Sequence, residues 1–112
     1  MSRIRIAVVG AGNWGRNHVR TVATLPDASL SAVCDIDPRR LDPLRRLYPG
    51  TLMTASLEEA LAQADAVVVS SPAAAHAPAA TAAIERGLPV LVEKPFALSG
   101  AEAEAVAALG DA

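Results

Sequence analysis

A glycine-rich turn directly after an apolar run is the feature that most constrains what this chain can fold into. Residues 3–9 alternate between arginine and isoleucine and then become wholly apolar, which is typical of a strand buried in a parallel sheet. Residues 10–15 read Gly-Ala-Gly-Asn-Trp-Gly and fit the spacing G-x-G-x-x-G. Residues 14–25 carry apolar side chains at helical spacing before Pro26 ends the run. The sequence therefore predicts a strand, a tight turn and a helix that opens toward an anion.

Each glycine of this turn answers a separate physical demand. Gly10 permits the tight turn, and Gly12 lets the backbone approach a pyrophosphate without a Cβ in the way. Gly15 allows the helix to lie close to the strand. The backbone N–H groups at the start of the helix, around Asn13 and Trp14, would face the phosphates. This turn is therefore expected to bind the pyrophosphate of a dinucleotide, against the alternative of a structural turn without a ligand.

A carboxylate stands where such a site needs an acceptor for the adenosine ribose. A second apolar run, residues 30–34, leads into Asp35, which comes 20 residues after Gly15. Asp37 competes for the role, but it has a sufficient structural task as the N-cap of a helix that begins at Pro38. Asp35 has no such task in the sequence pattern, so the ribose is assigned to Asp35.

The same carboxylate bears on the choice of cofactor. A negative charge at Asp35 repels a 2′-phosphate, so the sequence favours NAD over NADP. Arg39 and Arg40 lie close enough to form an alternative phosphate clamp, although a solvated helix face is the simpler interpretation. Cys34 is interpreted as a small buried strand residue without chemistry.

The rest of the chain continues to alternate between strand and helix. The expected elements are a helix from Pro38 with Leu41, Leu44, Leu47 and Tyr48 buried, a weak strand at 51–54, a short helix with a Ser56–Glu59 capping box ending near Gln63, a strand at 66–70, a helix at about 77–86 with Gly87 as C′ residue, a strand at 90–92 and a last helix from Ser99 to Gly110. Strict alternation with short connections predicts an α/β fold, a doubly wound parallel sheet of the Rossmann type. About five strands in the order 3-2-1-4-5 are expected, one short of six, in one dinucleotide-binding domain over residues 1–112.

Composition excludes several other classes of protein. The formal net charge is -2, which gives no field for nucleic acid or for an acidic membrane. No stretch approaches the ~20 apolar residues of a membrane span, and no leader peptide precedes the first strand, so a cytoplasmic location is expected. The single cysteine excludes an intramolecular disulfide.

Two later loops add a resemblance to a known family. Ser70-Ser71-Pro72 and Glu93-Lys94-Pro95 follow the fourth and fifth expected strands, whose carboxyl ends should meet the cofactor. With the glycine turn, Asp35, His76 and the run 87–96, the sequence resembles the glucose-fructose oxidoreductase, inositol dehydrogenase and rhizopine-catabolism family, called Gfo/Idh/MocA.

The resemblance implies roles for residues that the spacing alone does not assign. Ser71 and Pro72 would border the nicotinamide-side ribose, and Glu93 and Lys94 would contact that ribose and the nicotinamide region. Lys94 would also point at the substrate and assist proton transfer, which makes it the candidate catalytic residue. His76 either lines the cofactor site or packs at the start of its helix.

The chain departs from the family pattern in two respects. Ala73 stands where the family frequently has Asn after the Pro of the strand-four loop, and nothing resembles the family's substrate domain. The expectation is therefore an NAD(P)-binding domain of an oxidoreductase that acts on a sugar or polyol CH–OH group, without catalysis by itself. The alternatives are a stand-alone NAD(H) sensor and a domain for another adenine ligand such as coenzyme A. A homodimer through the strand-five side is also expected, because that edge would present unpaired backbone groups.

Overall fold

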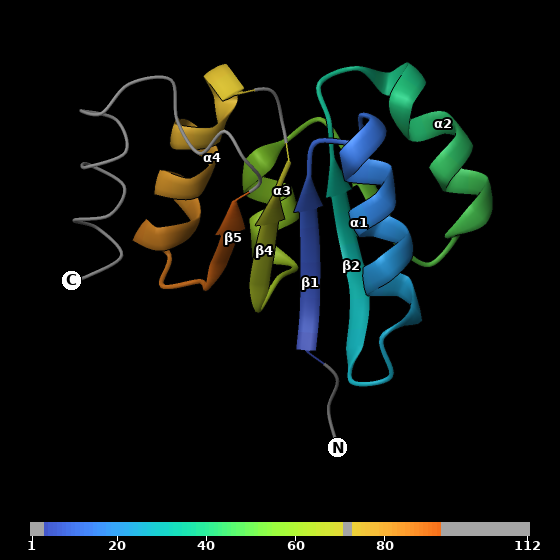
Figure 1. The fold of residues 1–112 in the computed structure, drawn as a ribbon, viewed down its shortest axis with the longest axis horizontal. Helices are drawn as coiled ribbons and strands as arrows, with labels where there is room; N and C mark the ends of the chain where they lie inside the picture. Colours follow the sequence, from blue (N-terminus) through green and yellow to red (C-terminus); the bar gives the residue numbers. More distant parts are fainter. Residues whose placement is uncertain (1–3, 71–72, 93–112) are drawn as a thin grey trace.

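The fold is a single parallel sheet with helices on both faces. The computed structural model describes residues 4–70 and 73–92. The strands run parallel in the order β3-β2-β1-β4-β5, as predicted. Figure 1 shows β2, β1, β4 and β5 side by side in this order. The elements are β1 (Ile4–Val9), α1 (Asn13–Thr24), β2 (Ala28–Cys34), α2 (Pro38–Leu47), β3 (Leu52–Thr54), α3 (Leu57–Ala62), β4 (Ala66–Val69), α4 (Ala73–Glu85) and β5 (Val90–Val92).

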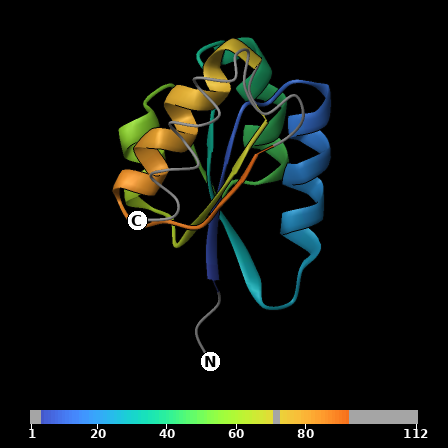
Figure 2. The ribbon, with the colours of Figure 1, turned by 60° about the vertical axis from the view of Figure 1, so that its left-hand side comes forward.

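The helices divide between the two faces of the sheet, which gives three layers (Figure 2). On one face, α1 and α2 pack over a cluster of Val8, Ala11, Val19, Val22, Leu30, Val33, Leu41, Leu44, Met53 and Val68. On the other face, α3 and α4 pack over a cluster of Ala7, Val9, Ala32, Cys34, Ala60, Leu61, Ala64, Val67, Val69, Ala79 and Ala83. The second cluster is rich in alanine, so its helices lie close to the strands with few bulky side chains between them.

The order of the strands sets the place of a ligand. β1 lies in the middle, the chain winds outward to β2 and β3, and it then crosses to β4 on the other side. In such a sheet the crevice at the carboxyl ends of the strands, where the winding direction reverses, receives the ligand. The crevice here lies beside the loops that follow β1 and β4.

A β-bulge in β2 was not foreseen. Ile6 pairs with Leu30 while Ala7 pairs with Ala32, so β2 carries one extra residue, Ser31, at this point. Leu30 packs toward α1 and α2, whereas Ala32 packs toward α3 and α4. Because a bulge changes which residues share a face, it determines which side chains at the carboxyl end of β2 face α1 and α2 and which face α3 and α4.

The helix ends follow local signals in the sequence. Asp37 caps α2 by accepting a hydrogen bond from the backbone N–H of Arg39 at 3.0 Å, as predicted. Gly87 has φ +75° and donates to the Ile84 carbonyl at 2.8 Å, while Leu88 donates to the Ala83 carbonyl at 3.0 Å. These two bonds form a Schellman motif, and the prediction of Gly87 as C′ residue is confirmed.

Three local predictions were wrong. Helix α4 begins at Ala73 rather than near Ala77, because the strong helix propensity of the alanine run carries the helix through Pro78. Leu47 is 68% exposed instead of buried, because it is the last residue of α2 and the helix buries only Leu41 and Leu44. Only half of the capping box at α3 forms: Ser56 accepts from the Glu59 N–H at 3.2 Å.

The other half of that box is replaced by a contact with β3. The Glu59 carboxylate accepts from the Thr54 hydroxyl at 2.9 Å, and the Ser56 N–H donates to the same hydroxyl at 2.9 Å. Thr54 is buried, so its hydroxyl gains two partners inside the fold. The predicted last helix, residues 99–110, lies outside the described residues.

Candidate dinucleotide site

The three glycines of the turn meet the three demands foreseen for them. Gly10 has φ +99°, a conformation that L side chains rarely adopt. A Cβ on Gly15 would collide with the Gly10 carbonyl group, with only 2.7 Å to its carbon. A Cβ on Gly12 would meet no atom within 4 Å. Gly12 therefore borders open space at the start of α1, where a pyrophosphate would fit.

Hydrogen bonds hold this turn to the ends of β2 and β4, the two strands that flank β1. The Gly10 N–H donates to the Cys34 carbonyl at the end of β2 at 2.7 Å. The Ser70 N–H, after β4, donates to the Val9 carbonyl at 2.8 Å, and the Ser70 hydroxyl donates to the Gly10 carbonyl at 3.1 Å. The turn is thus held from both sides at the carboxyl edge of the sheet before any ligand binds.

Asp35 has a structural task that the sequence pattern did not reveal. One carboxylate oxygen, Oδ2, accepts from the Ala11 N–H of the glycine turn at 2.8 Å, and Oδ1 accepts from the Asp37 N–H at 2.8 Å. The premise that Asp35 has no structural role was therefore wrong, because strand pairing brings it against the turn. The carboxylate holds the turn in place and lies beside the space in front of Gly12.

Two arginines at the start of α2 pair with the two carboxylates. Arg40 Nη1 lies 3.5 Å from Asp35 Oδ2, and the Asp35 side chain is only 4% exposed. Arg39 binds Asp37 through Nε and Nη2, each at 3.1 Å. Hydrogen bonding from Arg39 holds the pKa of Asp37 below its ordinary value, so Asp37 carries a negative charge at neutral pH.

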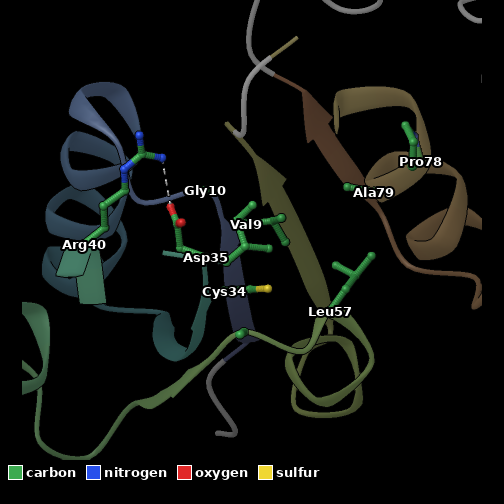
Figure 3. A pocket seen from close by; sticks show the side chains of 10 residues that line it. Val9, Gly10, Cys34, Asp35, Arg40, Leu57, Pro78 and Ala79 are labelled. Atoms are coloured by element: carbon green, nitrogen blue, oxygen red, sulfur yellow. Dashed lines mark ion pairs between the residues drawn. The ribbon is translucent and has the colours of Figure 1, made fainter. Parts of the chain in front are cut away.

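An apolar cavity opens on the other side of Asp35 (Figure 3). It has a volume of about 290 Å³ and is lined by Val9, Gly10, Cys34, Asp35, Ile36, Arg40, Ala55, Leu57, Pro78 and Ala79. The walls come from the ends of β1 and β2, the loop after β3, and helices α2, α3 and α4. Ile36 is 87% exposed at its edge. Apolar walls with two charged groups, Asp35 and Arg40, suit a flat aromatic base whose polar edge faces outward.

Cys34 lies at the base of this cavity. Its side chain is buried, as predicted. Burial, and then the neighbouring charge of Asp35, raises the pKa of the thiol. The thiol is therefore protonated at neutral pH and behaves as a small apolar wall group.

The fold and this site define a class of protein. A glycine turn at the start of a helix, a carboxylate at the end of the second strand and an apolar cavity beside it form the site of a dinucleotide-binding Rossmann domain. Residues 4–111 match the family described as "Oxidoreductase family, NAD-binding Rossmann fold", GFO_IDH_MocA. The chain belongs to this family, and it is an NAD-binding domain of the Gfo/Idh/MocA oxidoreductases.

Similar proteins agree with this assignment. An inositol 2-dehydrogenase of Renibacterium salmoninarum is 38% identical over 105 residues, which cover 89% of this chain and 31% of that protein. The structure of GenD2 from gentamicin A biosynthesis in complex with NAD has a TM-score of 0.90 and 39% identity, and the match covers 99% of this chain and 32% of that one. Scyllo-inositol dehydrogenase from Lactobacillus casei, with bound NAD(H) and scyllo-inositol, has a TM-score of 0.89 and 27% identity over 96% of this chain and 33% of that one. The chain thus spans about a third of the length of these relatives.

The structure brings together only part of the predicted site. Gly10, Gly12, Gly15 and Asp35 meet at one end of the sheet. Asn13 and Trp14 are the first two residues of α1, and His76 lies in the first half of α4. The other predicted site residues lie outside the described residues: Ser71, Pro72, Glu93 and Lys94.

The cavity wall was missed by the sequence analysis. Ala55 and Leu57 lie more than 20 residues before Pro78 and Ala79, so the wall comes from two segments that are far apart along the chain. Each stands near the carboxyl end of a strand or at the helix that follows, which is the one signal that could have singled them out. No helix within residues 4–70 and 73–92 has the length and apolar character needed to cross a membrane.

Proposed function

We propose that this domain binds the adenosine half of NAD(H) with the base in the apolar cavity and the ribose at Asp35. The observation that carries the proposal is the position of Asp35, between the apolar cavity and the open space before Gly12. A base in the cavity, a ribose at the carboxylate and phosphates at the start of α1 follow the order of groups in the cofactor.

The nicotinamide half is assigned by family resemblance. We propose that Ser71 and Pro72 border its ribose, that His76 lines the cofactor site, and that Glu93 and Lys94 contact the same ribose and the nicotinamide region. Lys94 would assist proton transfer at the carbon that exchanges a hydride with the cofactor. NAD supplies that hydride acceptor when bound, and this chain's own residues orient and hold it.

The substrate class follows from the relatives. Inositol dehydrogenases among them act on polyols, so we propose that the whole protein oxidises or reduces a sugar or polyol CH–OH group. The chain spans about a third of such proteins, and hydride transfer needs a substrate held over the nicotinamide. We therefore expect residues 1–112 alone to bind the cofactor without turnover. We also propose that the protein is located in the cytoplasm.

Calorimetric titration of NAD⁺ with a cavity-filling variant tests the proposed binding mode. Ala55 lines the cavity from the loop after β3, so Ala55→Phe should fill it and weaken NAD⁺ binding at least tenfold. Ala62→Phe places the same side chain on the exposed face of α3, outside the cavity, and should bind NAD⁺ like the wild type.

The outcomes separate the parts of the proposal. Absence of NAD⁺ binding to the wild type would refute the proposed function. Equal binding by Ala55→Phe and by the wild type would show that the base lies elsewhere.

A further inference from the structure

The peptide group before Gly10 continues the hydrogen bonding of the sheet beyond the end of β1. Its carbonyl, that of Val9, accepts from the Ser70 N–H at 2.8 Å. Its N–H, that of Gly10, donates to the Cys34 carbonyl at 2.7 Å. The two partners lie at the ends of β4 and β2, the strands on either side of β1 (Figure 1). Backbone groups therefore hold this peptide from both sides.

The peptide group after Gly10 is held by side chains instead. The Gly10 carbonyl accepts from the Ser70 hydroxyl at 3.1 Å, and the Ala11 N–H donates to Asp35 Oδ2 at 2.8 Å. The C=O and N–H of a trans peptide point in opposite directions, so the two side chains hold this group from opposite sides. Ser70 and Asp35 thus extend the hydrogen bonding by one step where the strands have ended.

The conformation of Gly10 explains why a hydroxyl is needed at position 70. In an extended strand, the N–H and C=O of one residue point toward the same neighbouring strand. With φ at +99°, the Gly10 N–H faces β2 while its carbonyl faces Ser70, after β4. The Ser70 N–H is already bonded to Val9, so the hydroxyl is the donor that Ser70 offers to this carbonyl. Gly10 is buried, and a buried carbonyl without a partner is costly.

The Ser70 hydroxyl also lies at the packing contact of α1. A Cβ placed on Gly15 would come 3.0 Å from Ser70 Oγ and 2.7 Å from the Gly10 carbonyl carbon. The hydroxyl, the first turn of α1 and the Gly10 carbonyl therefore meet at one point. Because they are packed together, the orientation of this carbonyl is coupled to the position of α1. The N–H groups that α1 offers to a phosphate depend on that position.

We propose that Ser70 is a positioning residue for the pyrophosphate of the dinucleotide. Its hydroxyl fixes the peptide between Gly10 and Ala11, with the N–H toward Asp35 and the carbonyl away from that carboxylate. Without the hydroxyl, this peptide gains freedom to turn, and part of the binding energy of the cofactor is used to restore its orientation. The inference rests on the proposed function, which places the phosphates at the start of α1.

Titration of NAD⁺ and of ADP into the wild type and Ser70→Ala tests this role. ADP carries the adenosine and two phosphates but no nicotinamide. The variant loses one hydrogen bond to the turn, so both affinities should fall by the same factor, about three- to tenfold. A loss for NAD⁺ without a loss for ADP would overturn the assignment, because the effect would then arise on the nicotinamide side of the site.

Thr51→Val is the matched control. The Thr51 hydroxyl donates to the Leu30 carbonyl at 2.8 Å, so this variant also removes one bond from a hydroxyl to a backbone carbonyl. Thr51 precedes β3 at its amino end, and neither Thr51 nor Leu30 lines the apolar cavity. Both variants should melt at a lower temperature, but Thr51→Val should keep its NAD⁺ affinity within about twofold of the wild type. An equal loss of affinity in both variants would reduce the effect to stability and overturn the assignment.

Hydrogen exchange at the Ala11 N–H reports on the peptide directly. This N–H is bonded to Asp35, and Ser70 holds the other side of the same peptide. Ser70→Ala should therefore speed its exchange at least about fivefold, whereas Thr51→Val should leave it as in the wild type. Equal exchange in Ser70→Ala and in the wild type would show that the hydroxyl does not hold the peptide.

Ser70→Thr tests whether the hydroxyl is the group responsible. It keeps the donor, so it should bind NAD⁺ and ADP like the wild type. A Ser70→Thr protein that melts like the wild type but binds as weakly as Ser70→Ala would overturn the assignment. Wild-type affinity in Ser70→Ala would refute the role of Ser70 alone, whereas absence of NAD⁺ binding to the wild type would refute the proposed function itself.

Discussion

Adding one methyl group to Gly12 or to Gly15 should separate ligand binding from folding in the glycine turn. Gly12 is the N-cap of α1, with φ -72° and ψ -163°, a backbone conformation open to any residue. A Cβ at Gly12 has no atom within 4 Å, whereas one at Gly15 falls 2.7 Å from the Gly10 carbonyl carbon and 3.0 Å from Ser70 Oγ. The two variants Gly12→Ala and Gly15→Ala therefore carry the same chemical change into open space and into a packed contact.

The magnitudes follow from these surroundings. The neighbour of Gly15 is backbone, so α1 and the turn must move apart, and overpacking of this kind costs about 1–3 kcal/mol. Alanine returns ~0.5–1 kcal/mol through its better helix propensity. The midpoints of these ranges give a net loss of about 1 kcal/mol, which lowers the melting temperature by roughly 4–8 °C. Gly12→Ala should change the free energy of unfolding by less than about 0.5 kcal/mol.

Thermal unfolding and NAD⁺ titration read out the two effects separately. Gly12→Val, whose branched side chain would occupy the space for the pyrophosphate, should unfold like the wild type and lose NAD⁺ binding. Gly15→Ala should unfold at a lower temperature. A Gly15→Ala melting temperature equal to that of the wild type would refute the packing argument, and wild-type NAD⁺ affinity in Gly12→Val would place the phosphates elsewhere.

Two further predictions concern the opposite end of the sheet and its edge. Hydrogen bonds from Arg5 lower the pKa of Asp65 in the folded protein. The pair therefore stabilises the fold fully at a pH above the pKa of about 3.9 that Asp65 has in the unfolded chain. This stabilisation is lost as the pH falls through the lower pKa that Asp65 has in the folded protein. Asp65→Asn should lower the melting temperature at about pH 7, and the difference from wild type should shrink toward about pH 3; an equal difference at both would contradict this. On the edge formed by β5, Leu91→Lys should convert a two-fold dimer into a monomer in light scattering, and a monomeric wild type across the accessible concentrations would exclude the dimer.

The structural features that the sequence predicted correctly are mostly those that a few neighbouring residues determine. The conformation of Gly10, the cap at Asp37 and the Schellman motif at Gly87 each depend on a few neighbouring residues. The strand order followed from assigning the alternating strands and helices to the dinucleotide-binding fold that the glycine turn indicates. These parts of the fold could therefore be predicted from the sequence.

Features that depend on distant segments could not be predicted in the same way. The bond from Ala11 to Asp35 exists because β1 and β2 pair across 24 residues of chain. The bulge at Ser31 changes the register without any glycine or proline to mark it. Helix α4 passes through Pro78 because alanine propensity and packing on the sheet outweigh the missing N–H.

The carboxylate of Asp35 supports the glycine turn and also lies beside the place that we propose for the ribose. A carboxylate offers about four acceptor positions. Hydrogen bonds from the N–H groups of Ala11 and Asp37 occupy two of them, and the ion pair with Arg40 at 3.5 Å occupies a third. About one position is left for a ribose hydroxyl, which is enough for a single strong bond. Replacing Asp35 would release the glycine turn together with the ribose contact, so its effects on folding and on selectivity are inseparable.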